Sequence, residues 1–326
     1  MKPVVFSGVQ PTGNLHIGNY LGAIRRWVPM QDRRENIFCV VDLHAITLPQ
    51  DPATLHHKIR EVAALYISCG IDPERSAVFV QSHVPAHAEL AWILNCITPM
   101  GWMRRMTQFK EKSAERREEV SVGLFDYPAL MAADILLYHT NLVPVGEDQR
   151  QHVELTRDIA IRFNTLFGPV FTIPEAEIAQ VGARIMSLTE PTKKMAKSEG
   201  GAGTIDLLDT PDAIRHKIAR AKTDPLREIV FDPNRPGVHN LLVIYELLSG
   251  QRRSDVEAHF AGKGYAELKR ELADLVVESL RPIQQRYHEI MDDPAWLTEV
   301  LDRGAARVSP VANKTLAEVK AKVGLG

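Results

Sequence analysis

The sequence has few cysteines, and their spacing carries no known pattern. Cys39, Cys69 and Cys96 are an odd number and form no Cys-x-x-Cys pair. Neither a disulfide framework nor a zinc knuckle is therefore indicated, and we predict no structural metal. We interpret the cysteines as small buried hydrophobic side chains.

Long apolar runs and a dominant charge are also missing. No apolar segment approaches the roughly 18 residues that a membrane-spanning helix needs, and the short apolar run before Gly8 is too brief for a secretion signal. With 39 Lys and Arg against 41 Asp and Glu, the formal net charge is −2, so no global field attracts nucleic acid or membrane. We expect a cytoplasmic protein without membrane contact, in which local basic patches bind any polyanion.

The composition is otherwise that of an ordinary globular protein. Hydrophobic residues make up 45% and charged residues 25% of the chain, which excludes disordered and fibrous classes. A length of 326 residues, at the usual size of about 150 residues per domain, predicts about two domains.

The first part of the chain alternates short β-branched runs with longer periodic segments, a pattern typical of a parallel sheet. We predict strands over 4–7, 37–42, 77–80 and 142–145, and helices over 17–28, 52–69, 87–97, 127–138 and 147–164. Residues 1–191 are therefore expected to form a doubly wound α/β domain of the Rossmann-like class. Ligands of such domains bind beyond the carboxyl ends of the strands.

The second part, residues 192–326, is expected to be α-helical. After a glycine-rich stretch, apolar side chains from Tyr265 to Ile290 recur at spacings of three and four residues, which places them on one face of a long helix. The pattern leaves open whether the last helices pack back on the first domain.

Two clusters carry chemistry. The first strand is followed by a Gly/Pro turn and a helix start that contains His16 and Gly18, where backbone N–H groups suit a phosphate. A tight turn with a surface histidine fits this cluster equally well. The second cluster has Lys194 and Lys197 in a glycine-flanked loop, suited to a migrating negative charge, although a solvated basic loop has the same composition. The two clusters in this order are more specific than either alone.

In this order the clusters resemble two motifs of class I aminoacyl-tRNA synthetases. His16-Ile17-Gly18-Asn19 is similar to their HIGH motif and Lys194-Met195-Ala196-Lys197-Ser198 to their KMSKS loop. Further segments, spread over the α/β region, resemble bacterial tryptophanyl-tRNA synthetases: 8–13, 42–47, 106–113, 131–136, 145–149 and 182–187.

The resemblance implies that L-tryptophan is activated with ATP, supplied with Mg²⁺ as the substrate complex, and transferred to the 3′ end of tRNA(Trp). It also implies a homodimer and a helical domain that binds the anticodon. A tyrosine-specific relative, a nucleotidyltransferase that uses no tRNA, and a non-catalytic RNA-binding paralogue remain as alternatives.

The resemblance also assigns roles to individual residues. The implied catalytic residues are His16, Asn19, Lys194 and Lys197. The implied ATP-binding residues are Gln10, Pro11, Thr12, Gly18, Asn19, Gly146, Glu147, Asp148, Ile185, Lys194, Met195, Ala196, Lys197 and Ser198. The implied tryptophan-binding residues are Phe6, His44, Tyr127, Met131, Asp134, Val143 and Gln149.

Asp134 stands out because it lies within an apolar helical segment, where a carboxylate is costly to bury without a hydrogen-bond donor. An internal ion pair or a loop cap would explain it. The resemblance implies instead that the indole N–H of tryptophan is the missing donor. Phe6, Met131 and Val143 are equally typical of a protein core.

Two positions depart from the family motifs. Asn19 replaces the last histidine of HIGH and keeps a hydrogen-bonding side chain, whereas Ala196 replaces the first serine of KMSKS and removes a hydroxyl.

We therefore predict that Ala196→Ser changes ATP affinity or the activation rate by no more than about tenfold, because a neutral hydrogen bond contributes about 0.5–1.5 kcal/mol. Tryptophan-dependent exchange of pyrophosphate into ATP, measured for both proteins, tests this. Activity that appears only in the Ser variant would contradict it.

Overall fold

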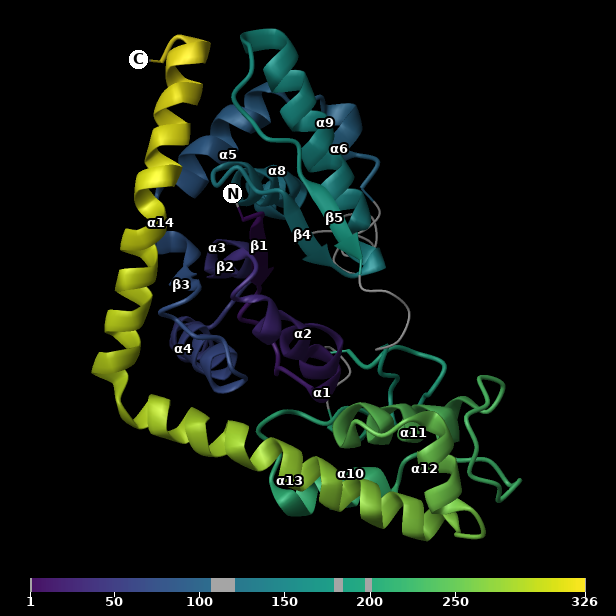
Figure 1. Cartoon of the computed structure of the whole chain (residues 1–326). Coiled ribbons are helices and arrows are strands. Elements are labelled where there is room, and N and C mark those ends of the chain that lie inside the picture. The colour runs from purple at the N-terminus through teal and green to yellow at the C-terminus, as the bar shows by residue number, and fades with distance from the viewer. Residues whose placement is uncertain (1, 107–120, 179–183, 197–200, 326) are drawn as a thin grey trace.

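The computed structural model describes residues 2–106, 121–178, 184–196 and 201–325, and its centre is a parallel sheet (Figure 1). The five strands lie in the order β3-β2-β1-β4-β5. They are β1 (Val4–Val9), β2 (Glu35–Val40), β3 (Ala77–Val80), β4 (Leu142–Val145) and β5 (Glu175–Ile178). The chain builds outward from β1 through β2 to β3 and then returns to the other side of β1. The carboxyl ends of β1 and β4 therefore form the switch point at which α/β sheets bind ligands.

Helices flank the sheet and form the second half of the chain. Those of the first half are α1 (Ile17–Asn19), α2 (Arg25–Trp27), α3 (Asp42–Ala45), α4 (Pro52–Ser68), α5 (Ala86–Ile97), α6 (Met100–Met103), α8 (Val122–Leu136) and α9 (Arg150–Phe167). Those of the second half are α10 (Pro211–Ala219), α11 (Pro236–Ser249), α12 (Arg253–Phe260), α13 (Tyr265–Asp292) and α14 (Pro294–Val323). Among the described residues, no helix is both long and apolar enough to cross a membrane.

Both faces of the sheet are buried. Along β2, Phe38 and Val40 join one hydrophobic cluster, while Ile37 and Cys39 join the cluster on the opposite face. This alternation follows from the two-residue period of a strand. The continuous apolar runs that predicted the strands exist because both faces are covered, as in parallel sheets generally.

The predicted strands over 77–80 and 142–145 are confirmed, and one further strand was not predicted. β5 has the sequence Glu-Ala-Glu-Ile and pairs only with β4 among the described strands. It lies at the edge of the sheet with no fully buried residue. An edge strand needs no apolar run, so its sequence carries little strand signal.

The predicted helix over 17–28 is divided into short pieces. A π-helical turn, Tyr20–Ile24, lies between α1 and α2, and a 3-10 turn, Val28–Met30, follows. The N–H of Arg25 reaches the carbonyl of Tyr20, five residues earlier. Periodicity predicts a helical segment but does not distinguish these hydrogen-bond patterns.

The starts of two later helices also differ from the prediction. α8 begins at Val122, earlier than the predicted start at residue 127, because the Ser121 side chain accepts a hydrogen bond from the N–H of Leu124 and caps the helix. The predicted helix over 147–164 begins as a 3-10 turn, Glu147–Gln149, and continues as α9.

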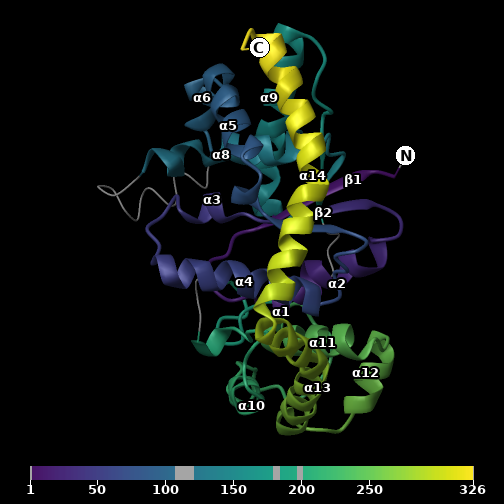
Figure 2. The ribbon, with the colours of Figure 1, turned by 90° about the vertical axis from the view of Figure 1, so that its left-hand side faces the viewer.

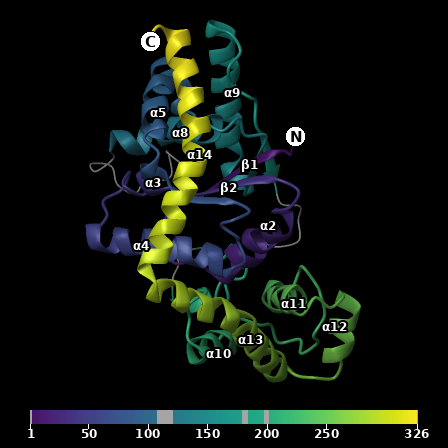
Figure 3. The ribbon, with the colours of Figure 1, turned by 60° about the vertical axis from the view of Figure 1, so that its left-hand side comes forward.

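The last helix, α14, returns to the α/β part of the molecule. Figure 1 shows it next to β3, and Figures 2 and 3 show it crossing in front of the sheet, while α10 to α13 lie together beyond one end of the sheet. Leu297 and Val300 join the cluster on one face of the sheet, and Ala305 and Val308 join the other. α14 therefore covers the edge strand β3. The division of the chain into domains at 191/192 remains a prediction.

The packing of α14 depends on Gly304. A Cβ at this position would lie 1.9 Å from the carbonyl oxygen of Val78 and 2.7 Å from its carbonyl carbon, both in the β3 backbone. The helix approaches the strand this closely because residue 304 has no side chain.

We expect Gly304→Ala to destabilise the protein by about 1–3 kcal/mol, the usual cost of overpacking. Gly101→Ala is the control, because a Cβ on this helical glycine meets no atom within 4 Å. Denaturant unfolding of both variants tests the difference. Equal stabilities would show that α14 shifts outward without cost.

Candidate active site

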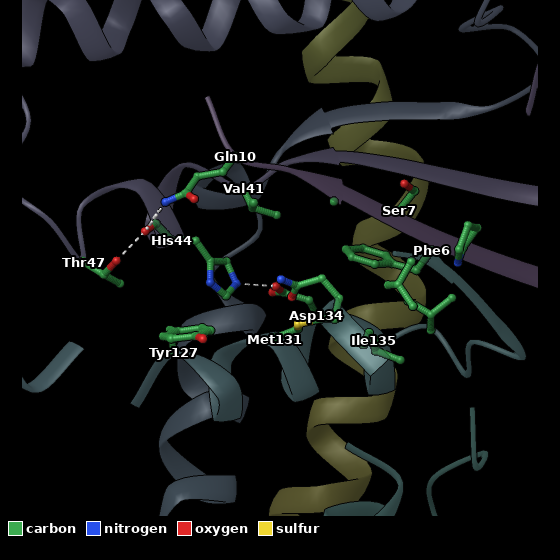
Figure 4. A pocket seen from close by; sticks show the side chains of 15 residues that line it. Phe6, Ser7, Gln10, Val41, His44, Thr47, Tyr127, Met131, Asp134 and Ile135 are labelled. Atoms are coloured by element: carbon green, nitrogen blue, oxygen red, sulfur yellow. Dashed lines mark hydrogen bonds and ion pairs between the residues drawn. The ribbon is translucent and has the colours of Figure 1, made fainter. Parts of the chain in front are cut away.

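A cavity of about 260 Å³ opens where β1 and β4 end, at the switch point of the sheet. Figure 4 shows side chains from β1, α3 and α8 pointing into it. The cavity is lined by Phe6, Ser7, Gly8, Gln10, Val41, His44, Thr47, Tyr127, Met131, Asp134, Ile135, Val143, Pro144, Val145 and Gln149.

All seven residues predicted for the amino acid line this one cavity, and so does Gln10, which was predicted for the nucleotide. Their role as ligand contacts remains a prediction. The sequence analysis gave no binding role to these further lining residues: Ser7, Gly8, Val41, Thr47, Ile135, Pro144 and Val145. The signal that would have found them is their position at or next to strand ends and one helical turn from Met131.

Asp134 forms the polar wall of the cavity and is buried, with 1% of its surface exposed. His44 Nε2 lies 2.8 Å from Oδ2, while Gln81 Nε2 donates to Oδ1 at 2.6 Å and His87 Nδ1 lies 2.6 Å from the same oxygen. Burial raises the pKa of this carboxyl, but the hydrogen bonds from His44 and His87 outweigh burial and hold the pKa at about 2. The side chain is therefore ionised at neutral pH.

This network corrects the expectation that a ligand is the missing donor of Asp134. The protein supplies donors itself, so burial of the carboxylate does not require a ligand. A carboxylate has about four acceptor positions, and within the described part of the chain His44 is the one residue bonded to Oδ2. One acceptor position therefore remains on an oxygen of a residue that lines the cavity.

Behind Asp134, the network continues to Tyr138. His87 is fully buried, and its Nε2 lies 2.6 Å from the Tyr138 hydroxyl. An ionised carboxylate can only accept, so Nδ1 donates to it, and burial raises the pKa of the Tyr138 phenol. Sequence reasoning missed His87 and Gln81. The available signal for His87 was its position within the apolar segment Ala86–Ile97. Many structural histidines in protein cores have the same position, so this signal does not indicate a site.

His44 is held by its backbone as well as by Asp134. Its carbonyl accepts from Gln10 Nε2 at 2.8 Å and from Thr47 Oγ1 at 2.7 Å (Figure 4). Its ring packs edge-on against Tyr127, with 6.1 Å between centroids, and the Tyr127 hydroxyl lies 2.7 Å from His152 Nε2. These contacts fix the polar and aromatic side of the cavity before a ligand arrives.

The helix start after β1 is tightly built. Asn19 Oδ1 accepts from the His16 N–H at 3.1 Å, and His16 is buried. A Cβ on Gly18 would lie 2.9 Å from His16 Nδ1 and 3.5 Å from Ile185 Cβ. The structure thus brings Ile185 to the His16-to-Asn19 segment, as expected if they share a ligand, and residue 18 must be small.

The lysine cluster meets the turn after β4. Lys194 Nζ lies 4.0 Å from Asp148 Oδ1, and both side chains are 55% exposed, so the pair contributes little to stability. Met195 is buried, so its side chain anchors this segment in the core. Lys197 and Ser198 lie outside the described residues. Among the described residues, Pro11, Thr12 and Glu147 form no hydrogen bond or ion pair with the other predicted nucleotide residues.

The chain is similar to known proteins over its whole length. A family model described as tRNA synthetases class I (W and Y) matches residues 1–281. The chain is 56% identical to the tryptophan–tRNA ligase of Thermosynechococcus vestitus, covering 98% of this chain and 99% of that protein. The crystal structure of Mycoplasma pneumoniae tryptophanyl-tRNA synthetase has a TM-score of 0.91 at 34% identity, covering 100% and 99% of the two chains. The Campylobacter jejuni tryptophanyl-tRNA synthetase complexed with ADP and tryptophan has a TM-score of 0.88 at 36% identity, covering 99% and 100%.

Proposed function

This chain belongs to the class I tRNA synthetases of tryptophan and tyrosine, and we propose that it is a tryptophan–tRNA ligase that activates L-tryptophan with ATP and transfers it to tRNA(Trp). The single observation that carries this proposal is the ionised, buried Asp134 with an acceptor position left at the cavity wall. The indole N–H of tryptophan is a donor that fits such an acceptor in an aromatic cavity, and the similarity to tryptophan–tRNA ligases favours it over the phenol O–H of tyrosine.

The cavity wall can select tryptophan by hydrogen bonding as well as by shape. Phe6, Tyr127 and Met131 supply apolar surface. Asp134 supplies a hydrogen-bond acceptor, which favours a ring that carries a donor. A site built to hydrogen-bond its substrate rejects analogues that lack the group by roughly 10⁴ to 10⁵, because the buried polar atom is then left unpaired.

Amino-acid activation requires no general base, because the attacking group is a carboxylate that is already anionic. Its oxygen bonds to the α-phosphorus of ATP, and pyrophosphate leaves. The protein's task is to align the reactants and stabilise the charge that moves to pyrophosphate. We assign phosphate binding to a set of four residues: His16, Asn19, Gln10 and Thr12. Lys194 and Lys197 stabilise the departing pyrophosphate, and Mg²⁺ enters with ATP as part of the substrate.

We assign the ribose and adenine of ATP to a second group of residues in the same site. Gly146, Glu147 and Asp148 follow β4, where they would meet the ribose, and Ile185 would meet the adenine. The 4.0 Å approach of Lys194 to Asp148 supports one shared nucleotide site, since it joins the two groups of residues.

We assign tRNA binding to the helical part, and the structure narrows the candidate phosphate contacts. Residues 215–222 contain four basic side chains and no acid in sequence. In the fold, however, Lys217 Nζ lies 2.6 Å from Asp209 and is 13% exposed, and Arg215 faces Asp274. Arg220 and Lys222 are exposed and are better placed to meet a phosphate. Because tRNA is the acceptor, the proposal includes a cytoplasmic location.

The proposal includes a homodimer formed through α5, α6 and α9. These helices expose large apolar side chains, with Trp92 at 69%, Met100 at 57% and Leu166 at 54%. Exposed apolar surface of this kind marks interaction sites in soluble proteins, and a second copy offers the same surface. Sedimentation of the purified chain tests this part separately.

Exchange of pyrophosphate into ATP tests the activity itself. We expect exchange that depends on tryptophan, with kcat/KM for tyrosine lower by at least about a hundredfold, since the cavity matches a different ring and donor. Exchange with tyrosine alone would support the tyrosine-specific alternative. Exchange with neither, from folded protein, would support a non-catalytic paralogue.

Asp134→Ala is expected to raise KM for tryptophan by at least about tenfold and KM for ATP by less than about threefold, because a hydrogen bond to a charged group contributes about 1.5–3 kcal/mol. The substitution also removes the partner of buried His87, so Asp134→Asn, which keeps the side-chain size, is measured beside it.

Asp126→Asn is the matched control, because Asp126 lies on the same helix but does not line the cavity. Steady-state exchange kinetics decide the outcome. Equal increases in both KM values, or the same shift in the control, would show that Asp134 acts only through the fold.

A further inference from the structure

The segment that carries Ile185 and the segment that carries Lys194 form a short antiparallel hairpin. The Met195 N–H donates to the Ile185 carbonyl at 3.0 Å, and the Ser187 N–H donates to the Lys193 carbonyl at 2.9 Å. Met186 lies opposite Lys194 in this pairing. The two candidate nucleotide contacts, Ile185 and Lys194, are therefore held in one hydrogen-bonded unit.

Met186 has its backbone groups on the outer edge of the hairpin. In an antiparallel pair, consecutive residues direct their N–H and C=O groups to alternate sides. Because Ile185 and Ser187 bond to the inner side, Met186 directs its own groups outward. These groups need partners when they are buried.

One side chain from the helical part satisfies both groups. Asn240, on α11, accepts from the Met186 N–H at 2.8 Å through Oδ1 and donates to the Met186 carbonyl at 2.9 Å through Nδ2. Asn240 is 3% exposed. Its amide acts here as a neighbouring strand would, so it closes the edge of the hairpin and ties it to α11.

The far end of the lysine segment is anchored independently. The Ile17 N–H donates to the Ile205 carbonyl at 2.9 Å, and the Leu207 N–H donates to the Leu15 carbonyl at 2.9 Å. This anchor holds the chain after the lysine cluster to the helix start at His16. Within the residues that the structure describes, the two hydrogen bonds of Asn240 are thus the side-chain hydrogen bonds that link the hairpin to the helical part.

We propose that Asn240 is a positioning residue for the nucleotide step. It touches neither substrate, but it holds the hairpin so that Ile185 lies beside Gly18 and Lys194 lies near Asp148. This inference rests on the proposed function, because it assumes that the nucleotide binds between these residues. Loss of the amide releases Met186 and lets the hairpin shift relative to the His16 segment, while the tryptophan cavity on the other side of β1 keeps its shape.

The test compares Asn240→Ala with a matched amide elsewhere. Asn164, at the end of α9, accepts from the N–H groups of Val170 and Phe171 and donates to the Phe171 carbonyl, at 2.8–3.0 Å. Asn164→Ala therefore removes a similar clamp between side chain and backbone, next to Phe163 and Phe171, which belong to the opposite hydrophobic cluster of the core. Melting temperatures of both variants show how much stability each clamp supplies.

For Asn240→Ala we expect KM for ATP to rise, or kcat to fall, by about tenfold, the effect of one to two neutral hydrogen bonds. KM for tryptophan in exchange, and its dissociation constant by equilibrium dialysis, should stay within about twofold, since the cavity contains none of these residues. Asn164→Ala should lower the melting temperature without changing either KM. If Asn240→Ala does not fold, Asn240→Ser, which retains one hydroxyl partner for Met186, is read in the same way with a smaller, few-fold effect.

The outcomes separate this inference from the proposed function. Wild-type protein without tryptophan-dependent exchange contradicts the function. Active wild-type protein with unchanged ATP parameters in the folded Asn240 variants overturns the positioning role. Equal shifts of the ATP and tryptophan constants, or the same ATP shift in Asn164→Ala, also overturn it, because these results describe a general loss of structure.

Discussion

The burial of one ionised carboxylate constrains the whole catalytic part of this protein. Asp134 lies in an apolar helix, and its charge is tolerated because donors reach it from three other segments: His44 from α3, Gln81 from the turn after β3 and His87 from α5. A buried charge without such partners would cost several kcal/mol. The same hydrogen bonds therefore fix the positions of α3, α5 and α8 relative to one another. They leave one acceptor position of Asp134 beside the cavity.

The same hydrogen bonds connect the polar wall of the cavity to its aromatic wall. His87, which binds Asp134, also forms a hydrogen bond with the Tyr138 hydroxyl. The ring of Tyr138 stacks on Phe6 with 5.8 Å between centroids. Phe6 is itself a lining residue of the cavity. Polar and apolar contacts thus connect Asp134 to Phe6 through buried residues behind the cavity. Buried hydrogen-bond networks of this kind favour a single arrangement of the core.

The nucleotide side is built on a different principle. Its candidate residues come from segments far apart in sequence, joined by backbone pairing between 15–17 and 205–207 and by the Asn240 amide. Lys194 and Asp148 are half exposed there, in contrast to the buried Asp134. An exposed, lightly held lysine costs little to move, which suits a group that acts on a charge that develops during the reaction.

The sequence by itself determined the class of fold and the residue types at the site. Apolar runs buried on both faces predicted the central strands, and the motif residues from His16 and from Lys194 predicted which chain segments meet a nucleotide. These signals are local, because strand period and turn chemistry depend on neighbouring residues. Only the tertiary structure decided the features that depend on distant partners. These are the polar edge strand β5, the close packing of α14 on β3 at Gly304, and the donors that stabilise the ionised form of Asp134. His87 and Asn240 look like ordinary polar residues of apolar helices in sequence, since a hydrogen bond to a partner 47 or 54 residues away leaves no periodic trace.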